Sequence, residues 1–175
     1  MLTIYRTPQL GQADNPPAMQ QVATMQKGDW LNLVNPTPEE IRLVSEQTGI
    51  AEEFIRYPLD DEELARVETE DGQILIIVDV PVVTNSAVIY DTMPLGIVQN
   101  EDFFVTISLN QLDLYNSFAG GRVKSAATFK KTRLTLQILQ IQTNIYLKFL
   151  RDINRRYEAL EARLRQNMNN DDLNS

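Results

Sequence analysis

The chain has 175 residues, enough for one domain with a substantial core and an appendage. Its formal net charge of -8 argues against nucleic-acid binding, which requires a basic surface. Because the sequence contains no Cys and no His, disulfides, thiolate catalysis and imidazole metal sites are excluded, and any bound metal must take oxygen ligands, as Mg²⁺ and Ca²⁺ do.

The N-terminal part of the sequence predicts strands separated by polar loops. Residues 2–6 alternate weakly between apolar and polar, and residues 22–26 predict a second strand that ends at the Lys27-Gly28-Asp29 turn. Residues 30–34, a mostly apolar run, predict a buried strand with Trp30 as a core anchor. Residues 8–17, rich in Pro, Gln and Asn, are expected to form a loop.

A helix start follows at Thr37. Thr37 and Glu40 have the spacing of a capping box, and Pro38 occupies the first helical position, where its missing N–H costs nothing. Gly49 is expected to end this helix. A second, short helix is predicted over residues 52–57 and ends at Pro58.

Four consecutive carboxylates come next, Asp60-Asp61-Glu62-Glu63. They are open to two interpretations. In the first, Asp60 and Asp61 bind a divalent cation, with Mg²⁺ keeping several waters and binding weakly. In the second, the segment is a solvated turn in which Asp60 caps a short helix.

The central part of the sequence predicts antiparallel hairpins. The Asp71-Gly72 dipeptide between two strand-like runs is the strongest hairpin signal in the chain. The expected strand pairs are residues 66–70 with 73–80, residues 82–84 with 87–91 around Asn85-Ser86, and residues 95–99 with 103–108. Residues 111–118 then predict a short helix that ends at Gly120-Gly121.

A long helix is expected from about residue 125, because no Gly or Pro occurs between there and residue 167. Its apolar residues recur with gaps of three and four, which is a heptad pattern, at Tyr146, Leu150, Ile153, Tyr157, Leu160 and Leu164. Such a stripe on a charged helix indicates packing against another helix. The Asn-rich segment after residue 167 is expected to break the helix, with Asp171 and Asp172 either capping the chain end or holding a cation.

These signals divide the chain into an α/β domain at residues 1–120 and a helical arm at residues 121–175. No catalytic group is predicted, because Gly120-Gly121 is too isolated to form a phosphate-binding loop and no nucleophile motif occurs. One hypothesis is therefore a free-standing interaction module that dimerises through the heptad stripe. The longest uninterrupted aliphatic run is residues 74–78, far short of the roughly 20 residues that cross a membrane.

The order of these segments resembles the CorA family of magnesium and cobalt transporters. The matching segments are residues 30–40, 49–50, 65–68, 76–81, 94–98, 105–106, 146–154, 160–161 and 164. The resemblance implies an α/β (α+β) fold, a mixed and largely antiparallel sheet flanked by helices and followed by a long helical arm.

In function, the resemblance implies the N-terminal regulatory domain of a divalent-cation transporter, on the cytoplasmic face of the membrane, within a homopentamer. It also implies that the chain ends before the stalk and the membrane-spanning helices, so that it contacts the membrane only through those missing parts and conducts no ions alone. Family members sense Mg²⁺ with carboxylates at subunit interfaces. Tyr57 occupies the position of one such aspartate here, and Asp60 and Asp61 are among the nearest carboxylates.

Overall fold

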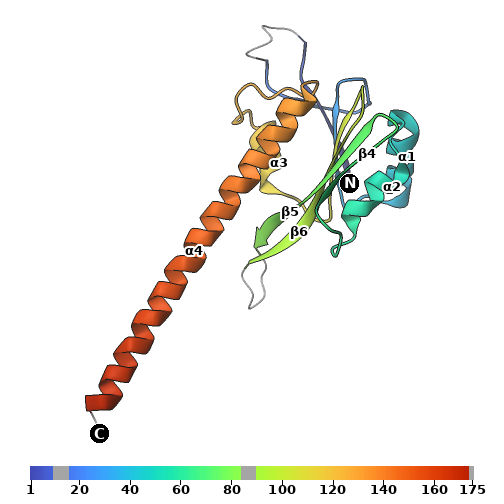
Figure 1. Ribbon diagram of the computed structural model, residues 1–175. Coiled ribbons are helices and arrows are strands. Elements are labelled where there is room, and N and C mark those ends of the chain that lie inside the picture. The colour runs from blue at the N-terminus through green and yellow to red at the C-terminus, as the bar shows by residue number, and fades with distance from the viewer. Residues whose placement is uncertain (10–15, 84–89, 174–175) are drawn as a thin grey trace.

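The computed structural model describes residues 1–9, 16–83 and 90–173, and in them a seven-stranded sheet lies between two layers of helices (Figure 1). The strands are β1 (Leu2–Arg6), β2 (Gln20–Val22), β3 (Trp30–Val34), β4 (Arg66–Glu70), β5 (Gln73–Val83), β6 (Tyr90–Gln99) and β7 (Phe104–Ser108). The helices are α1 (Pro38–Thr48), α2 (Glu52–Arg56), the short 3-10 helix η1 (Tyr57–Leu59), α3 (Asp113–Ala119) and α4 (Lys131–Leu173). The predicted α/β class with a long helical arm is confirmed.

The sheet is mixed and largely antiparallel, as predicted. Its strand order is β2-β1-β3-β7-β6-β5-β4. Every pair among the described strands is antiparallel except β3 and β7, which run parallel with Trp30 opposite Phe104 and Val34 opposite Ser108. The three hairpin strands β5, β6 and β7 thus join the N-terminal strands through one parallel contact.

Helices α1 and α2 cover one face of the sheet. The predicted capping box is present: the Glu40 N–H donates to the Thr37 hydroxyl at 3.2 Å, and the Thr37 N–H donates to the Glu40 carboxylate at 3.0 Å. Gly49 ends α1 with a φ of 74°, a left-handed conformation that suits glycine. The core beneath this layer is apolar and contains Leu31, Leu33, Ile41, Val44, Phe54, Ile55, Leu75, Ile77, Val105 and Ile107.

Helix α3 and the first half of α4 cover the opposite face. Trp30 is fully buried there, as expected, and its ring packs edge-on against Phe104, Tyr115 and Phe118. The indole N–H donates to the Thr106 hydroxyl at 2.8 Å, so the one polar atom of the side chain is paired. Leu134 of α4 completes this core.

Two expectations about strand positions were wrong. The second strand lies at Gln20–Val22 rather than at residues 22–26, because the later residues form a turn around Asp29. The expected break near Pro81 does not occur, and β5 continues to Val83. Pairing between β4 and β5 has ended at Ile77, so Pro81 lies on an open edge, where a missing N–H is tolerated. The predicted Asn85-Ser86 turn lies outside the described residues.

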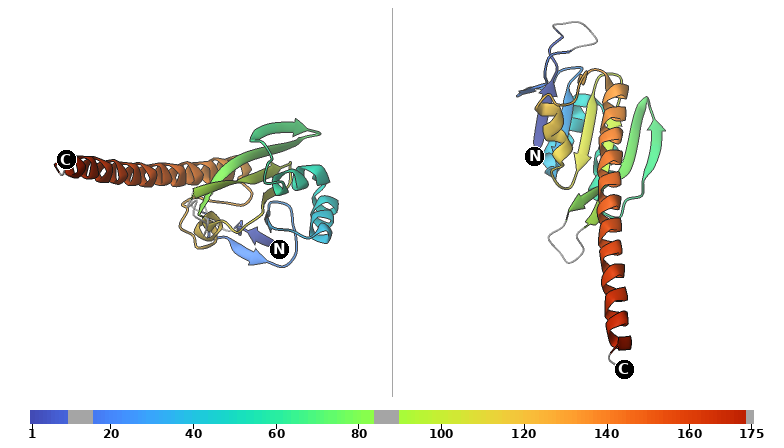
Figure 2. Two further views of the ribbon diagram at one scale, coloured as in Figure 1. Left: turned by 90° about the horizontal axis from the view of Figure 1, so that it is seen from below. Right: turned by 90° about the vertical axis from the view of Figure 1, so that its left-hand side faces the viewer.

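Helix α4 also begins and ends later than expected. Ser125 has a φ of 57°, which is incompatible with a helix, and α4 starts at Lys131. It continues through the Asn-rich segment to Leu173, so the predicted break after residue 167 is wrong. Its 43 residues correspond to about 65 Å. Figure 2 shows α4 crossing the sheet face opposite α1 and α2 and then extending well beyond the sheet.

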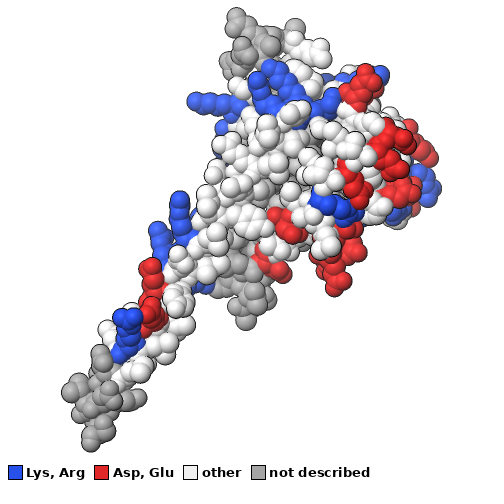
Figure 3. Space-filling view, viewed as in Figure 1, with Lys and Arg blue, Asp and Glu red and all other residues white. Residues whose placement is uncertain are grey.

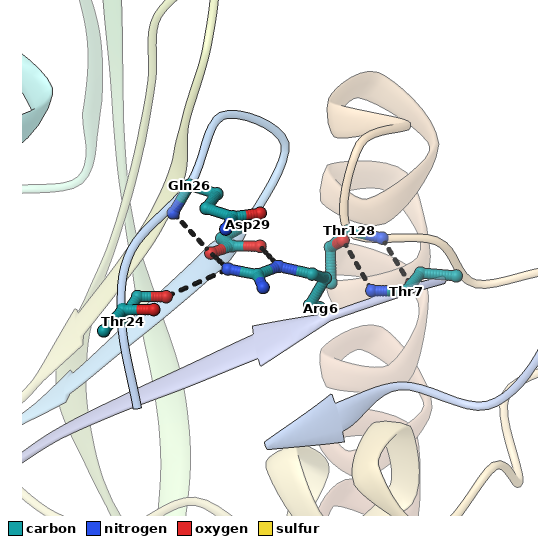
Figure 4. Close-up of polar contacts among 6 residues, drawn as sticks. All are labelled: Arg6, Thr7, Thr24, Gln26, Asp29 and Thr128. Carbon is teal, nitrogen blue, oxygen red and sulfur yellow. Dashed lines mark hydrogen bonds and ion pairs between the residues drawn. The ribbon is translucent and has the colours of Figure 1, made fainter. Parts of the chain in front are cut away.

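Polar contacts hold the start of α4 against the N-terminal strand (Figure 4). The Thr7 N–H donates to the Thr128 hydroxyl and the Thr128 N–H donates to the Thr7 hydroxyl, both at 3.0 Å and both buried. Beside them, the Arg6 guanidinium makes two 2.7 Å hydrogen bonds to the buried Asp29 carboxylate. The Thr7–Thr128 bonds thus fix the segment before α4 to the end of β1, and the Arg6–Asp29 pair fixes β1 to the turn before β3.

Candidate functional site

The acidic turn follows η1 on the α1–α2 side of the sheet. The Asp60 N–H donates to the Tyr57 carbonyl at 3.2 Å, and the Glu62 N–H donates to the Asp60 carboxylate at 3.0 Å. Asp60 therefore caps this turn with one oxygen. Asp60, Asp61 and Glu62 are all exposed to solvent. The structure places the two residues predicted to bind a cation, Asp60 and Asp61, side by side on a surface turn.

Arg66 binds the end of this acidic segment. Its guanidinium pairs with Glu63 and donates to the Glu68 carboxylate at 2.7 Å, and it lies 5.0 Å from the centre of the Tyr57 ring. The hydrogen bond to Glu68 is the main cause of a raised pKa of Arg66, because it favours the cation. Tyr57, which stands where the family resemblance implies an aspartate, is thus part of a cation–π contact.

An acidic crevice of about 340 Å³ lies beside the turn, between α2 and the β4–β5 hairpin. It is lined by Ala51, Glu53, Phe54, Tyr57, Glu68, Glu70, Asp71 and Gln73. No local sequence pattern predicts this crevice, because Glu53 and the hairpin carboxylates are far apart along the chain. One hint in the sequence was that Glu68 and Glu70 are two residues apart, which places both side chains on the same face of a short edge strand.

Charge is strongly segregated along the chain. Residues 36–73 contain twelve carboxylates and three arginines, whereas residues 122–168 contain eleven Lys or Arg residues and three carboxylates. Figure 3 shows carboxylates gathered over the side of the body that carries α1, α2 and β4. The net acidity of the protein therefore belongs to one face of the body, and the arm is basic.

The acidic face attracts cations through its field but does not enclose one. Among the residues described, no group of three or more carboxylates is arranged so that it could hold a metal ion. Mg²⁺ is commonly held by one or two carboxylates with the remaining positions occupied by water. A site at Asp60 and Asp61 in a single chain would thus depend on water or on oxygen atoms from another chain for most of its ligands.

The heptad stripe of α4 is exposed over the projecting half of the helix. Leu150, Ile153 and Tyr157 are 57%, 44% and 65% exposed, respectively, and Leu160 and Leu164 are similarly accessible. The sequence prediction that these residues form one face of a helix is confirmed. Asp171 and Asp172 lie in the last turn of α4, and their predicted role in capping the chain end or holding a cation stays a prediction.

The structure places the protein in a class of α/β domains in which helices cover both faces of a mixed sheet and a long helical arm extends from the body. Among the described residues, no helix combines the length and the apolar character needed to cross a lipid bilayer. Residues 25–175 match the family described as CorA-like Mg²⁺ transporter protein, and the chain belongs to this family.

Individual relatives agree with this assignment. The cobalt/magnesium transport protein CorA of Methanocaldococcus jannaschii is 26% identical over 144 residues, which cover 77% of this chain and 43% of that protein. The structure of the soluble domain of the same protein superposes with a TM-score of 0.74 at 20% identity, covering 94% of this chain and 64% of that one. The ZntB cytoplasmic domain of Vibrio parahaemolyticus gives a TM-score of 0.63 at 14% identity, covering 86% and 62%. The chain thus spans less than half the length of the curated relative.

Proposed function

We propose that this chain is the regulatory domain of a CorA-like transporter of divalent cations, magnesium or cobalt, and that it contributes to cation-dependent gating. The observation that carries the proposal is the family match across residues 25–175, which covers the body from the turn before β3 onward and the entire arm. In this role the domain has no enzymatic activity, lies at the cytoplasmic face of the membrane, and self-associates as part of a homopentamer.

The proposed regulatory ligand is Mg²⁺, bound weakly through Asp60 and Asp61. Carboxylates collected on one face repel one another, and a divalent cation relieves that repulsion. Support comes from the exposure of both side chains and from the twelve carboxylates of residues 36–73. In a homopentamer, a neighbouring subunit would supply the further oxygen ligands. Loss of the cation would then free the subunits to move, which is the proposed basis of gating.

Thermal unfolding in increasing Mg²⁺ tests the proposed site, because an ion that binds the folded state raises the thermal midpoint by mass action. The Asp60→Asn/Asp61→Asn variant is expected to lose this rise. Glu46→Gln/Glu158→Gln is the matched control, since it removes the same charge from exposed positions in α1 and α4 that lie outside the acidic crevice. Equal responses of the two variants, or a flat wild-type response through roughly 20 mM Mg²⁺, would rule out the site in the single domain.

The transporter assignment has a separate test in the coding sequence after Ser175. The family that the chain resembles carries the signature Gly-Met-Asn after its first membrane span, so the assignment predicts two hydrophobic spans with this signature following the first. A stop codon there would contradict it.

A second candidate function is favoured by the exposed stripe of α4, which suits a free-standing module that dimerises. Sedimentation equilibrium would then detect a concentration-dependent dimer that Leu160→Asp abolishes. A monomer at all concentrations would exclude this function.

A further inference from the structure

The Asp79 carbonyl in β5 lacks a backbone donor on both sides. In the β5–β6 register, Asp79 lies opposite Pro94, which has no N–H. On the other side, the last pair between β5 and β4 joins Ile77 and Arg66, so β4 does not reach Asp79. The carbonyl is exposed, so it is open to water or to a side-chain donor, and neither neighbouring strand provides a backbone N–H.

The arm supplies this donor. The Tyr146 hydroxyl of α4 donates to the Asp79 carbonyl at 2.8 Å. Partial burial raises the pKa of Tyr146, with a further contribution from the Asp79 charge, so the hydroxyl keeps its proton well above neutral pH. A side chain of the arm therefore completes the hydrogen bonding of the sheet at the point where two prolines, Pro81 and Pro94, weaken it.

Tyr146 lies near the point where α4 leaves the body, about one turn before Phe149, which still lies beside Pro81. The residues before Tyr146 pack on the sheet, with Leu134 and Ile138 fully buried, whereas Leu150 is 57% exposed. The start of α4 is held by the reciprocal Thr7–Thr128 hydrogen bonds and by a hydrogen bond of 2.6 Å from the Lys131 ammonium to the Glu101 carbonyl. Helix α4 is thus fixed at a buried root and held again by a solvent-exposed contact at its exit.

We propose that the Tyr146–Asp79 hydrogen bond is a latch that sets the direction of the arm, and that α4 tilts about its root as a lever when the latch opens. Tyr146 is 15 residues from the start of α4 and the last helical residue is 42 residues from it, or about 22 Å and 63 Å. A small displacement at Tyr146 is therefore magnified about threefold at the tip. The latch therefore determines the direction in which the exposed stripe of the arm points. This role does not depend on which ion the protein handles.

Distance measurements between pairs of spin labels test this lever. The sequence has no Cys, so two introduced cysteines are labelled without interference. One label is placed on α1 by Gln47→Cys and the second on α4 by either Gln140→Cys or Gln166→Cys, all at exposed positions. The first α4 site reports the docked half of the helix and the second reports the projecting half.

Tyr146→Phe removes the hydroxyl but keeps the ring, and it is expected to broaden the distance distribution for the Gln166 label roughly four times as much as for the Gln140 label. This ratio follows from their positions 35 and 9 residues after the start of α4. Tyr157→Phe, which removes the hydroxyl of an exposed ring on the projecting half, is the control and should leave both distributions unchanged.

Two results would overturn the proposal. If Tyr146→Phe leaves the Gln166 distribution as narrow as Tyr157→Phe does, the hydroxyl does not hold the arm. If both labels broaden equally, α4 leaves the sheet as a whole and does not tilt about its root. A circular dichroism melt of each labelled variant confirms that the body is folded at the temperature of the measurement.

Discussion

Gly96 of β6 lies directly beneath Pro58 of η1, with no room between them for a methyl group. A Cβ atom built on Gly96 would lie 2.1 Å from the Pro58 Cγ atom and 2.8 Å from its Cβ atom. This contact packs η1 tightly against the sheet. The acidic turn begins at Asp60, the residue that directly follows η1. The position of the candidate cation site thus depends on a glycine in the strand that lies directly under η1.

Gly96→Ala is therefore expected to destabilise the domain by about 1–3 kcal/mol, because the added methyl group must displace a proline ring in a packed core. Urea unfolding measures the change. The double variant Gly96→Ala/Pro58→Ala should recover part of the loss, since it removes the opposing atoms. A single variant as stable as wild type would show that η1 moves away at little cost.

For the partly buried Arg6–Asp29 ion pair, replacing one partner is expected to cost more stability than replacing both. The Asp29 side chain is only 1% exposed and also accepts a hydrogen bond of 2.7 Å from the Gln26 N–H. Arg6→Met leaves that buried carboxylate without its countercharge and is expected to cost about 3 kcal/mol. Arg6→Met/Asp29→Asn should be more stable than Arg6→Met alone in the same unfolding assay, and the opposite order would contradict this account.

The buried hydroxyl of Tyr115 makes the free energy of unfolding depend on pH in the alkaline range. Burial raises the pKa of its hydroxyl to about 12, against a reference value of 10.0. The neutral form is favoured in the folded protein, so the group has no effect below about pH 10, and stability then falls as the unfolded chain alone ionises. Between pH 10 and 12 the free energy of unfolding should decrease by about 2–3 kcal/mol from this residue. The difference between wild type and Tyr115→Phe across this range isolates the effect, and parallel curves would contradict it.

The two halves of α4 should respond differently to the same substitution. Leu134 is fully buried, and Leu134→Ala is expected to cost about 2–4 kcal/mol because it leaves a cavity in the core. Leu160 is 57% exposed, and Leu160→Ala should change the free energy of unfolding by less than about 0.5 kcal/mol. Thermal or urea unfolding of the two variants at low protein concentration makes the comparison. A large cost at Leu160 would show that the stripe is already covered in solution.

The sequence predicted those elements whose determinants are local. The capping box at Thr37, the Asp71-Gly72 hairpin and the heptad stripe each depend on residues a few positions apart, and all three are present in the structure. The strand expected at residues 22–26 was wrong because a distant residue, Arg6, together with Asp29 organises that segment as a turn. The apolar character of those residues carried no sign of this contact.

The candidate site was predictable only in part, for the same reason. Asp60 and Asp61 were identified because they are adjacent in the sequence. The crevice that brings Glu53 of α2 to Glu68 of β4 requires the packing of a helix on a hairpin, which no local pattern encodes. Tyr146 was assigned to the stripe by its spacing, but its bond to Asp79 depends on where β4 ends and on which residue of β6 is a proline.

The parallel pairing of β3 with β7 has a consequence for synthesis of the chain. Trp30 is opposite Phe104, so β3 leaves the ribosome 74 residues before the strand that completes it. At synthesis rates of 5–20 residues per second, this interval is about 4–15 s. During that time β3, whose residues Leu31 and Leu33 end fully buried, presents an open strand edge to other chains. The open edge of β3 is therefore available for misassociation with other chains until residue 108 has emerged.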